Sequence, residues 1–345
     1  MAPRTYTPAW WLPGAHLRTL WGKVFRQGDP MASRVERWET PDDDFLDIAR
    51  LDAPPGSPRL VLLHGLEGSP RSHYARGLMA EAARRGWAAD LLIFRGCGAD
   101  LNRARRFYHS GETTDLAWVV DRLTHEDPSR PLLFAGVSLG GNVLLKWLGE
   151  SGEEVDPRVV AAAAVSVPFD LGRSSRHIDR GFSRIYQRHF LRSLRRKALA
   201  KLERYPNLVE RSALEGARTL YEFDDVVTAR IHGFESADDY YRRSSAIAWI
   251  DRVRVPTLLL SAIDDPFLPR DVLDDVAGIA ALNPYLVAEF PSHGGHVGFV
   301  GGSIPLKPFY YAEWRVGEFL AARLAEHTVA SSSSRGLPVP LSGEM

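Results

Sequence analysis

The sequence predicts an α/β fold, in which a mostly parallel central sheet is flanked by helices and carries a helical cap insertion. Three observations support this prediction. Short apolar runs alternate with helical patterns over residues 59–168, the alternation resumes over residues 257–325, and the charged, helical residues 170–250 between them contain no convincing buried strand. Strands that alternate with helices form βαβ units, whose parallel sheet is covered on both faces.

The composition narrows the class of protein. The chain has 345 residues, of which 45% are hydrophobic and 25% charged, as in ordinary globular domains. Lys plus Arg and Asp plus Glu both number 43, and this balance argues against a nucleic-acid partner, which positive charge would attract. The single cysteine, Cys97, excludes an internal disulfide and a zinc site built from several cysteines.

The elements before the insertion follow one another in a regular order. Strand 59–64 is a continuous apolar run that ends at Gly65, as expected of a strand buried on both faces. A helix over 111–123 takes Ser110 as its N-cap and has an acidic residue in its first turn. The other elements predicted here are strands 87–94, 132–137 and 159–167 and helices 73–85 and 141–148.

The pattern resumes after the insertion, which favours one interrupted α/β domain over two independent domains. The elements predicted there are strands 257–262 and 286–290 and helices 271–281 and 308–325. We expect the following division: an N-terminal extension packing on the core (1–34), a core domain (35–169 and 251–328), a helical cap insertion (170–250) and a mobile tail (329–345).

Targeting and membrane signals are not evident in the sequence. The first residues lack the charged start, apolar core and small-residue cleavage site of a secretion signal. The aromatic residues 10–12 are soon followed by charged ones, and no run reaches the ~18 apolar residues of a membrane span. We therefore expect a cytoplasmic protein without an integral membrane segment.

A nucleophile candidate stands where one predicted strand meets the next helix. Residues 136–140 read Gly-Val-Ser-Leu-Gly, the form G-x-S-x-G, and strand 132–137 ends just before Ser138. Such a strand–turn–helix corner is strained, and glycines on either side of the serine let the backbone turn without a Cβ clash. The corner lifts the Ser138 hydroxyl above the sheet and points a helix N-terminus at it.

A serine hydroxyl needs a base, and the base needs an orienting acid. In this arrangement the chain order is Ser, then Asp or Glu, then His, each just past a strand end. For the acid we prefer Asp265 over Asp264, because it directly precedes a proline and Asp264 suits a turn. For the base we prefer His296 over His293, which we expect to hydrogen-bond within its loop.

The oxyanion of a tetrahedral intermediate needs two N–H donors. One should be Leu139, the residue after the nucleophile, and the second Leu66, in the loop after the first buried strand. His64, in the same loop, is expected to be a structural hydrogen-bonder. The pair His293 and His296 has no third ligand at a recognisable spacing, so we expect neither a metal nor another cofactor.

Together these residues resemble the α/β-hydrolase fold, and in detail its YheT-like esterase branch, bacterial relatives of the ABHD-type lipases. The resemblance covers about residues 8–325, and the combination is far more specific than the serine motif alone. The stretches that carry it are 64–69, 94–97, 108–113, 138–142, 181–186, 222–225, 228–233, 264–267 and 293–299.

The resemblance implies a carboxylic-ester hydrolase of the short-chain carboxylesterase or acylglycerol lipase type, with the triad Ser138, Asp265 and His296. Its substrate would be a small-molecule or lipid ester. A thioesterase or amidase with the same triad stays open, as does a non-catalytic scaffold that binds a ligand or partner. Cys97 has no histidine partner placed in sequence order, so a structural thiol is favoured over a second nucleophile. The sequence leaves the oligomeric state open.

One helix of the insertion is amphipathic. Its apolar face could line an acyl-chain pocket or pack the core of the cap, and the second is favoured. That face contains Phe182, Ile185, Tyr186, Phe190, Leu194 and Ala198. The other face is basic and is either solvated or attracted weakly to anionic lipid surfaces. The basic residues are Arg184, Arg188, Arg192, Arg195, Arg196, Lys197, Lys201 and Arg204.

Overall fold

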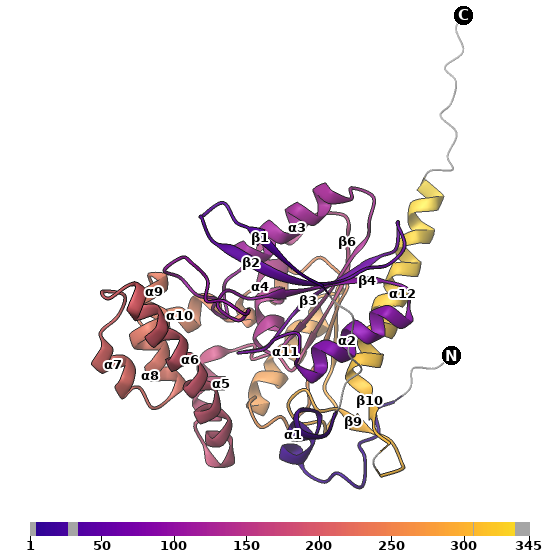
Figure 1. The fold of residues 1–345 in the computed structure, drawn as a ribbon. Helices are drawn as coiled ribbons and strands as arrows, with labels where there is room; N and C mark the ends of the chain where they lie inside the picture. Colours follow the sequence, from indigo (N-terminus) through magenta and orange to yellow (C-terminus); the bar gives the residue numbers. More distant parts are fainter. Residues whose placement is uncertain (1–4, 27–33, 306, 335–345) are drawn as a thin grey trace, which may run out of the picture.

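A computed structural model describes residues 5–26, 34–305 and 307–334. It contains an eight-stranded sheet in the order β1-β2-β4-β3-β5-β6-β7-β8 (Figure 1). The strands are β1 Arg34–Glu39, β2 Phe45–Leu51, β3 Arg59–Leu63, β4 Ala88–Ile93, β5 Leu132–Val137, β6 Val159–Val165, β7 Thr257–Leu260 and β8 Leu286–Glu289. A separate two-stranded ribbon joins β9 Val300–Gly301 to β10 Phe309–Tyr310.

The sheet is mostly parallel, which confirms the predicted fold class. All pairs from β4 to β8 run parallel, whereas β1 pairs antiparallel with β2 and β2 antiparallel with β4. The strand order reverses around β3, which lies between β4 and β5. In sheets of this kind, ligands bind beside the carboxyl ends of the strands near such a reversal.

The hairpin β1–β2 was missed by the sequence analysis. Strand β1 reads Arg-Val-Glu-Arg-Trp-Glu and buries only Trp38, so it lacks the apolar run by which the other strands were recognised. Strand β2 is buried but contains two charged residues, Asp47 and Arg50. Both are compensated: Asp47 pairs with Arg37, and Arg50 with Asp90. Strand β1 is at the edge of the sheet, and its charged side chains discourage pairing with a strand of another chain.

Helices cover both faces of the sheet. On one face lie α2 (His73–Arg84) and α12 (Tyr311–Ser334), and on the other α3 (Thr114–Glu126), α4 (Leu139–Ser151) and α11 (Arg270–Leu282). Strand β5 shows the consequence for sequence, because Leu132 and Phe134 pack with the second group of helices and Leu133, Ala135 and Val137 with the first. A strand buried on both faces reads as a continuous apolar run.

Several helix boundaries shift from the predicted ones, and two of these shifts affect residues assigned a role above. Helix α3 begins at Thr114, because Glu112 accepts from the Thr114 N–H group in a turn, and Ser110 is not its N-cap. Helix α12 continues to Ser334, so residues 329–334 are helical and do not belong to the predicted tail. The remainder of that tail, residues 335–345, lies outside the described residues.

The segment between β6 and β7, which the structure describes in full, consists of helices joined by short loops and contains no strand. Its helices are α5 Leu171–Ile178, α6 Arg184–Arg204, α7 Arg211–Gly216, α8 Leu220–Phe223, α9 Ala229–His232 and α10 Ala237–Ser244. A π-helical segment, Asp224–Thr228, joins α8 to α9. Short 3₁₀ turns occupy Gly181–Ser183, Ala246–Ala248 and Ile250–Arg252. A further 3₁₀ turn, Gly152–Glu154, lies outside this segment and follows α4. Figure 1 shows α6 to α10 grouped to one side of the sheet.

The helical segment has a hydrophobic cluster of its own. This cluster contains Leu191, Ala198, Leu202, Leu208, Leu214, Ala217, Phe223 and Val227. It is separate from the two clusters that sandwich the sheet. Within the described ranges, every helix is too short or too polar to span a lipid bilayer.

The N-terminal residues lie against the far end of the chain. The Ala9 N–H group donates to the Val300 carbonyl at 2.9 Å, and Ala9, Leu12, Trp21 and Val300 form a small apolar cluster. Trp21 belongs to helix α1 (Ala15–Phe25). The predicted extension also includes residues 1–4 and 27–33, which lie outside the described residues.

Gly140 of α4 lies close to the backbone at the end of β3, and this close approach generates a prediction. A methyl group there would overlap the carbonyl oxygens of Leu63 and His64, which the sheet holds in place. We expect Gly140→Ala to lower the free energy of unfolding by about 1–3 kcal/mol, as overpacking of a core does. Urea denaturation measures this change.

The matched control is Gly278→Ala on α11, where a methyl group meets nothing within 4 Å. Removing a glycine from an open helix position should raise the free energy of unfolding by about 0.5–1 kcal/mol. A Gly140→Ala variant as stable as the unsubstituted protein would contradict the argument from packing.

Candidate active site

Ser138 lies on a sharp turn between β5 and α4. Its backbone has φ 53° and ψ −121°, a strained conformation for a residue with a side chain. Neighbouring glycines make the turn possible, because a Cβ on Gly136 would come within 2.5 Å of the Gly140 carbonyl oxygen. The serine is thereby held at the carboxyl end of β5, directly before the first N–H groups of α4.

The structure brings Ser138, His296 and Asp265 together from three separate strand ends. His296 follows β8 and Asp265 follows β7. The His296 Nε2 atom lies 3.1 Å from Ser138 Oγ, and His296 Nδ1 lies 2.9 Å from Asp265 Oδ2. A carboxylate can only accept, so Nδ1 carries the hydrogen and Nε2 is free to accept from the serine hydroxyl.

Asp265 and His296 are each held by further contacts. The Phe267 N–H group donates to Asp265 Oδ1 at 2.8 Å, and the Phe267 ring stacks on the His296 imidazole with centroids 4.1 Å apart. The His296 N–H group donates to Thr19 Oγ1 at 2.9 Å, so helix α1 also helps to fix the histidine. These contacts pre-set the orientation of both side chains.

Asp264 and His293, the alternatives to Asp265 and His296, lie beside the triad in a different environment. Asp264 accepts from the Gly295 N–H group at 2.8 Å and from Arg18 at 3.3 Å, so it fastens the histidine loop. His293 contacts Asp264 at 3.3 Å, in the neighbouring loop rather than within its own as expected. The His293 side chain is 58% exposed, whereas that of His296 is 9% exposed.

The two expected oxyanion donors belong to different elements, Leu66 to the loop after β3 and Leu139 to α4. Leu66 and Leu139 both line the same cavity as Ser138. Leu139 is the first residue of α4, so its N–H group has no acceptor within the helix. Gly65 lets the loop after β3 come close to Ser138. A Cβ on Gly65 would lie only 3.2 Å from the Ser138 Cβ, which is tighter than an ordinary contact.

His64 is buried and structural, as expected. Its Nε2 atom accepts from the Phe94 N–H group at 3.1 Å, so Nδ1 carries the hydrogen and donates to the Gly65 carbonyl at 2.7 Å. Burial lowers the pKa of His64 to about 4, so the ring is neutral at physiological pH. The ring thus fixes the loop that contains Leu66.

Glu67 connects this loop to helix α6. Its carboxylate accepts from Tyr108 at 2.9 Å, from Lys197 at 2.7 Å and from Ser193. Lys197 and Ser193 belong to α6. The side chain of Glu67 is mostly buried, and a buried carboxylate with a cationic and two hydroxyl donors is well compensated.

Cys97 lies at the edge of the same cluster, with its Sγ 3.3 Å from the Lys197 Nζ. Burial raises the pKa of the Cys97 thiol to about 11, although Lys197 opposes the shift. A thiol with this pKa stays protonated at neutral pH and is a poor nucleophile. The structural interpretation of this cysteine therefore fits its surroundings.

Asn142 is a positioning residue that the sequence analysis did not single out. Its side-chain amide donates to the Ser110 and Ser244 carbonyls, both at 2.7 Å, and its oxygen accepts from the Ala246 N–H group at 2.9 Å. Asn142 is fully buried in the first turns of α4. A polar residue at a core position of an apolar helix was the available signal.

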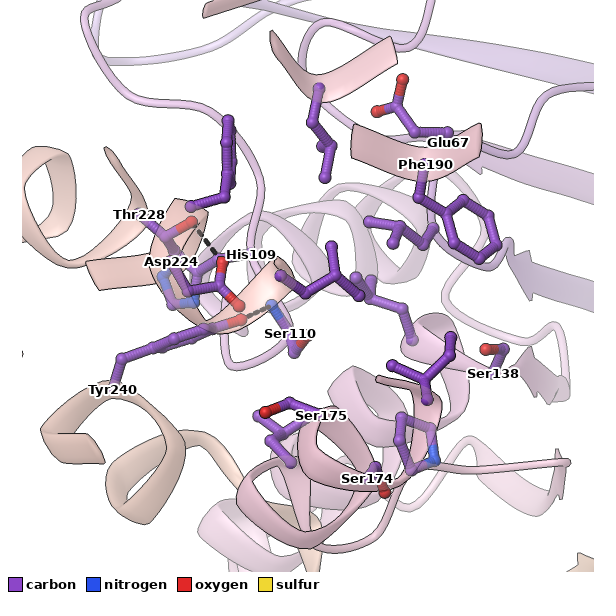
Figure 2. A pocket seen from close by; sticks show the side chains of 18 of the residues that line it. Glu67, His109, Ser110, Ser138, Ser174, Ser175, Phe190, Asp224, Thr228 and Tyr240 are labelled. Atoms are coloured by element: carbon purple, nitrogen blue, oxygen red, sulfur yellow. Dashed lines mark hydrogen bonds between the residues drawn. The ribbon is translucent and has the colours of Figure 1, made fainter. Parts of the chain in front are cut away.

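A cavity extends from Ser138 into the helical segment (Figure 2). Near Ser138 it is lined by Leu66, Leu139, Phe267 and His296. Apolar side chains dominate the remaining walls, among them Leu171, Ile178, Leu194, Leu220, Phe223 and Val227. Such a lining fits a substrate that has an apolar chain.

Polar groups gather at one end of this cavity. Figure 2 shows Asp224, Thr228, His109 and Tyr240 on one side and Ser138 on the opposite side. The Asp224 carboxylate accepts from Thr228 at 2.6 Å and from Tyr241 at 2.7 Å. Burial raises the pKa of Asp224 to about 6, because these two hydroxyl donors do not fully replace water.

The amphipathic helix α6 uses its apolar face in three ways. Phe190 and Leu194 line the cavity, Ala198 packs in the cluster of the helical segment, and Phe182 and Ile185 are exposed. Phe182 itself belongs to the 3₁₀ turn that precedes α6. One part of the apolar face of α6 therefore lines the cavity, and another part packs in the core of the helical segment, so each of the two alternatives holds for part of the face.

The basic face of α6 is less uniform than expected. Lys197 pairs with Glu67, Arg195 donates to the Ala217 carbonyl, and Lys201 is fully buried. The Lys201 ammonium donates to the Asn102 carbonyl and side chain at 2.8 and 2.9 Å. The residues that remain exposed are Arg184, Arg188, Arg192, Arg196 and Arg204.

Comparison with known proteins gives the context of this geometry. Residues 58–302 match the family model described as alpha/beta hydrolase fold. YheT of Escherichia coli K12, whose name assigns it provisionally to the esterases, is 41% identical over 314 residues, 90% of this chain and 91% of that protein. A Saccharomyces cerevisiae monoacylglycerol lipase is 31% identical over 269 residues, 75% of this chain and 58% of that protein.

Human phospholipase ABHD3 is a further relative, 26% identical over 332 residues, 94% of this chain and 80% of that protein. Among solved structures, the Pyrococcus furiosus esterase Pf2001 superimposes with a TM-score of 0.56 at 19% identity, covering 85% of this chain and 91% of that one. Est1E from Butyrivibrio proteoclasticus gives a TM-score of 0.54 at 14% identity, covering 84% and 99%. The structural matches support the fold.

The buried carboxylate of Asp224 generates a prediction about stability. Its pKa is about 6 in the folded protein and near 3.8 in the unfolded chain, so the folded state binds the proton more tightly. Stability is therefore lost as pH rises from 3.8 through 6. We expect Asp224→Asn to raise the free energy of unfolding by about 1–3 kcal/mol at neutral pH, because the buried charge is removed.

Denaturation of both proteins over a pH series measures this difference. The gain should shrink as the medium becomes more acidic and vanish where Asp224 is protonated in both states. The control is Asp225→Asn, whose carboxylate only accepts from the Ala237 N–H group. An Asp224→Asn protein that is less stable at every pH would contradict the assignment of a costly buried charge.

Proposed function

Because the chain belongs to the α/β hydrolase fold family, we propose that it is a serine hydrolase that cleaves carboxylic esters. One observation carries this proposal, the hydrogen-bonded series Ser138–His296–Asp265 at 3.1 and 2.9 Å beside a largely apolar cavity. The names of the relatives point the same way, since they describe an esterase, a monoacylglycerol lipase and a phospholipase.

In the first half of the reaction Ser138 Oγ attacks the carbonyl carbon of the ester. His296 Nε2 takes the hydroxyl proton, and Asp265 stabilises the imidazolium that forms. The carbonyl oxygen becomes an oxyanion that accepts from the N–H groups of Leu66 and Leu139. When the tetrahedral intermediate collapses, the bond to the alcohol oxygen breaks, and His296 returns the proton to the alcohol as it leaves.

In the second half a water molecule attacks the acyl group on Ser138. His296 takes a proton from this water, a second tetrahedral intermediate forms, and the bond to Ser138 Oγ breaks. The proton passes from His296 back to Ser138, and the carboxylic acid leaves. The cycle needs no metal ion or cofactor, since every proton is transferred by the same imidazole.

The class of acyl compound is a finer proposal. The carboxylic ester is favoured by the names of the relatives, and the same three side chains could cleave a thioester or an amide. A substrate panel with matched acyl groups separates the three classes. The alternative of another class is a non-catalytic scaffold that binds a ligand or partner. Such a scaffold would not need the contacts by which Phe267, Thr19 and Asp264 fix His296 and its loop.

A weak peripheral contact with lipid is a separate proposal. The exposed arginines of α6 adjoin two exposed apolar side chains, Phe182 and Ile185, at its N-terminal end. Apolar side chains beside basic ones are the combination that binds anionic membrane surfaces. This contact would place an ester-hydrolysing site near its lipid substrate. The cytoplasmic location likewise stays a prediction from the sequence.

The catalytic proposal predicts labelling by a fluorophosphonate probe, which reacts with activated serines. The unsubstituted protein should label and hydrolyse p-nitrophenyl esters, and Ser138→Ala should abolish labelling and lower kcat/KM by roughly 10³-fold or more. The control Ser212→Ala, on an exposed helix, should label normally. A protein that does not label, or a Ser138→Ala variant that still labels, would remove the enzyme hypothesis.

The lipid proposal predicts salt-sensitive co-sedimentation with vesicles that contain anionic phospholipid. We expect reversal of Arg188 and Arg192 to glutamate to weaken this binding, because each basic residue near such a surface contributes about 1 kcal/mol. A matched reversal at the exposed Arg71, on another part of the surface, should leave it unchanged. Equal binding to neutral and anionic vesicles would argue against the proposal.

A further inference from the structure

We propose that the end of the cavity opposite Ser138 is a binding subsite for a hydroxyl group carried on the chain of the substrate. The subsite is formed by Asp224, Tyr240, His109 and His232, with Thr228 and Tyr241 as supporting residues. The inference rests on the ester hydrolysis proposed above and names a class of substrate for it, esters with a hydroxylated chain. Catalysis at Ser138 does not require any of these side chains.

The subsite is assembled from three separate parts of the chain. His109 comes from the loop before α3, Asp224 from the π-helical segment, and Tyr240 from α10. Hydrogen bonds hold them together: the Ser110 N–H group donates to the Tyr240 hydroxyl at 2.9 Å, and Tyr241 donates to Asp224. The rings of His109 and His232 lie 4.5 Å apart, and His109 also packs on Tyr240.

Several polar groups of this subsite retain hydrogen-bonding capacity. Each Asp224 oxygen accepts one hydrogen bond and can accept another, and the Tyr240 hydroxyl accepts from Ser110 while its own hydrogen can be donated. The His232 imidazole, which lines the cavity, makes no hydrogen bond within the described part of the chain. Unpaired polar groups in such a place are costly unless a ligand or water pairs them.

A hydroxyl group fits this set because it both donates and accepts. It can donate to the Asp224 carboxylate and accept from Tyr240 or from an imidazole N–H. An anionic group would be repelled by Asp224. Burial, and after it nearby positive charges such as that of Lys146, hold the pKa of His109 well below its usual range, so its ring is neutral and suits a neutral ligand group.

The local backbone also points to a function other than stability. Asp224 begins a π-helical segment of five residues, Asp224–Thr228, and such segments are rare and frequently lie at functional sites. Burial raises the pKa of Asp224, and perturbed pKa values cluster at functional sites. Residues 108–113, 222–225 and 228–233 belong to the sequence stretches that carry the resemblance, and the triad explains none of them.

The remaining cavity defines the rest of the substrate. Between Ser138 and the group formed by Asp224, His109 and Tyr240, Figure 2 shows mainly side chains without polar atoms, with Ser174 and Ser175 along one wall. A substrate that reaches both ends therefore has its ester at Ser138, an apolar segment along these walls and its hydroxyl at the subsite. The hydroxyl could lie on the acyl chain or on the alcohol, and both positions share this recognition chemistry.

The test compares kcat/KM for paired esters that differ by one terminal hydroxyl, over a series of chain lengths. One arm uses p-nitrophenyl esters of straight-chain acids with and without a terminal hydroxyl. The other uses acetate esters of straight-chain alcohols and of the corresponding diols, with acid release as the readout. We expect a preference of roughly tenfold or more for the hydroxylated member in one arm, at one chain length.

The expected preference depends on named side chains. Asp224→Asn, which keeps the shape but removes the charge, should reduce the ratio of kcat/KM between the paired esters by roughly tenfold. The control Asp225→Asn, in the same π-helical segment but outside the cavity lining, should leave that ratio unchanged. The stability of both variants is measured alongside, so that a folding defect is recognised.

The outcomes separate this inference from the catalytic one. A protein that hydrolyses the plain esters but shows no hydroxyl preference in either arm overturns the subsite and leaves the esterase proposal standing. A preference that survives in Asp224→Asn also overturns it. A protein that hydrolyses none of the esters and does not label with fluorophosphonate overturns both. A chain-length optimum with a preference lost only in Asp224→Asn supports the subsite.

Discussion

The strained turn at Ser138 is the constraint on which the rest of the structure depends. The backbone can turn from β5 into α4 only because Gly136 and Gly140 have no side chains, and Gly140 lies against the carbonyl oxygens of β3. This close packing fixes the serine relative to the loop after β3, which contains Leu66. The strained residue thus lies where the sheet, the N-terminus of α4 and the loop after β3 meet. At such a position, N–H groups can stabilise negative charge on a reacting carbonyl oxygen.

The helical segment is attached to this site through charged groups inside the protein. Lys197 pairs with Glu67 in the loop after β3, and Lys201 donates to the carbonyl of Asn102 in the loop before α3. The buried Lys201 ammonium has three oxygen acceptors, as a buried ion requires, and the partly exposed Lys197 contacts the Glu67 carboxylate and the Cys97 Sγ. Asp224 differs from them, because only hydroxyl groups hold its carboxylate. These contacts therefore attach the helical segment to the core, whereas the Asp224 carboxylate lines the cavity itself.

Much of the site could be predicted from the sequence because its signals are local. A glycine-flanked serine after an apolar run marks the turn, and the placement of Asp265 and His296 after later strands follows from the chain order. Local signals fail where tertiary contacts decide. Asn142 reads as one polar residue in an apolar helix, and its contacts lie more than thirty residues away along the chain. The hairpin β1–β2 was missed because its charged residues interrupt the apolar pattern, and they are compensated only through tertiary pairs, Arg37 with Asp47 across the hairpin and Arg50 with Asp90 of β4.

By itself, the sequence determined the α/β fold class, the strand ends and the order of the candidate catalytic residues, since these depend on hydrophobic periodicity and on glycine at a strained turn. Only the tertiary structure decided that the His296 ring stacks on Phe267, that α1 holds its backbone and that Asp264 fastens its loop. It also decided that Asp224, His109 and Tyr240 share one cavity with Ser138. Residues this far apart in sequence become neighbours through packing of whole elements, which no local pattern encodes.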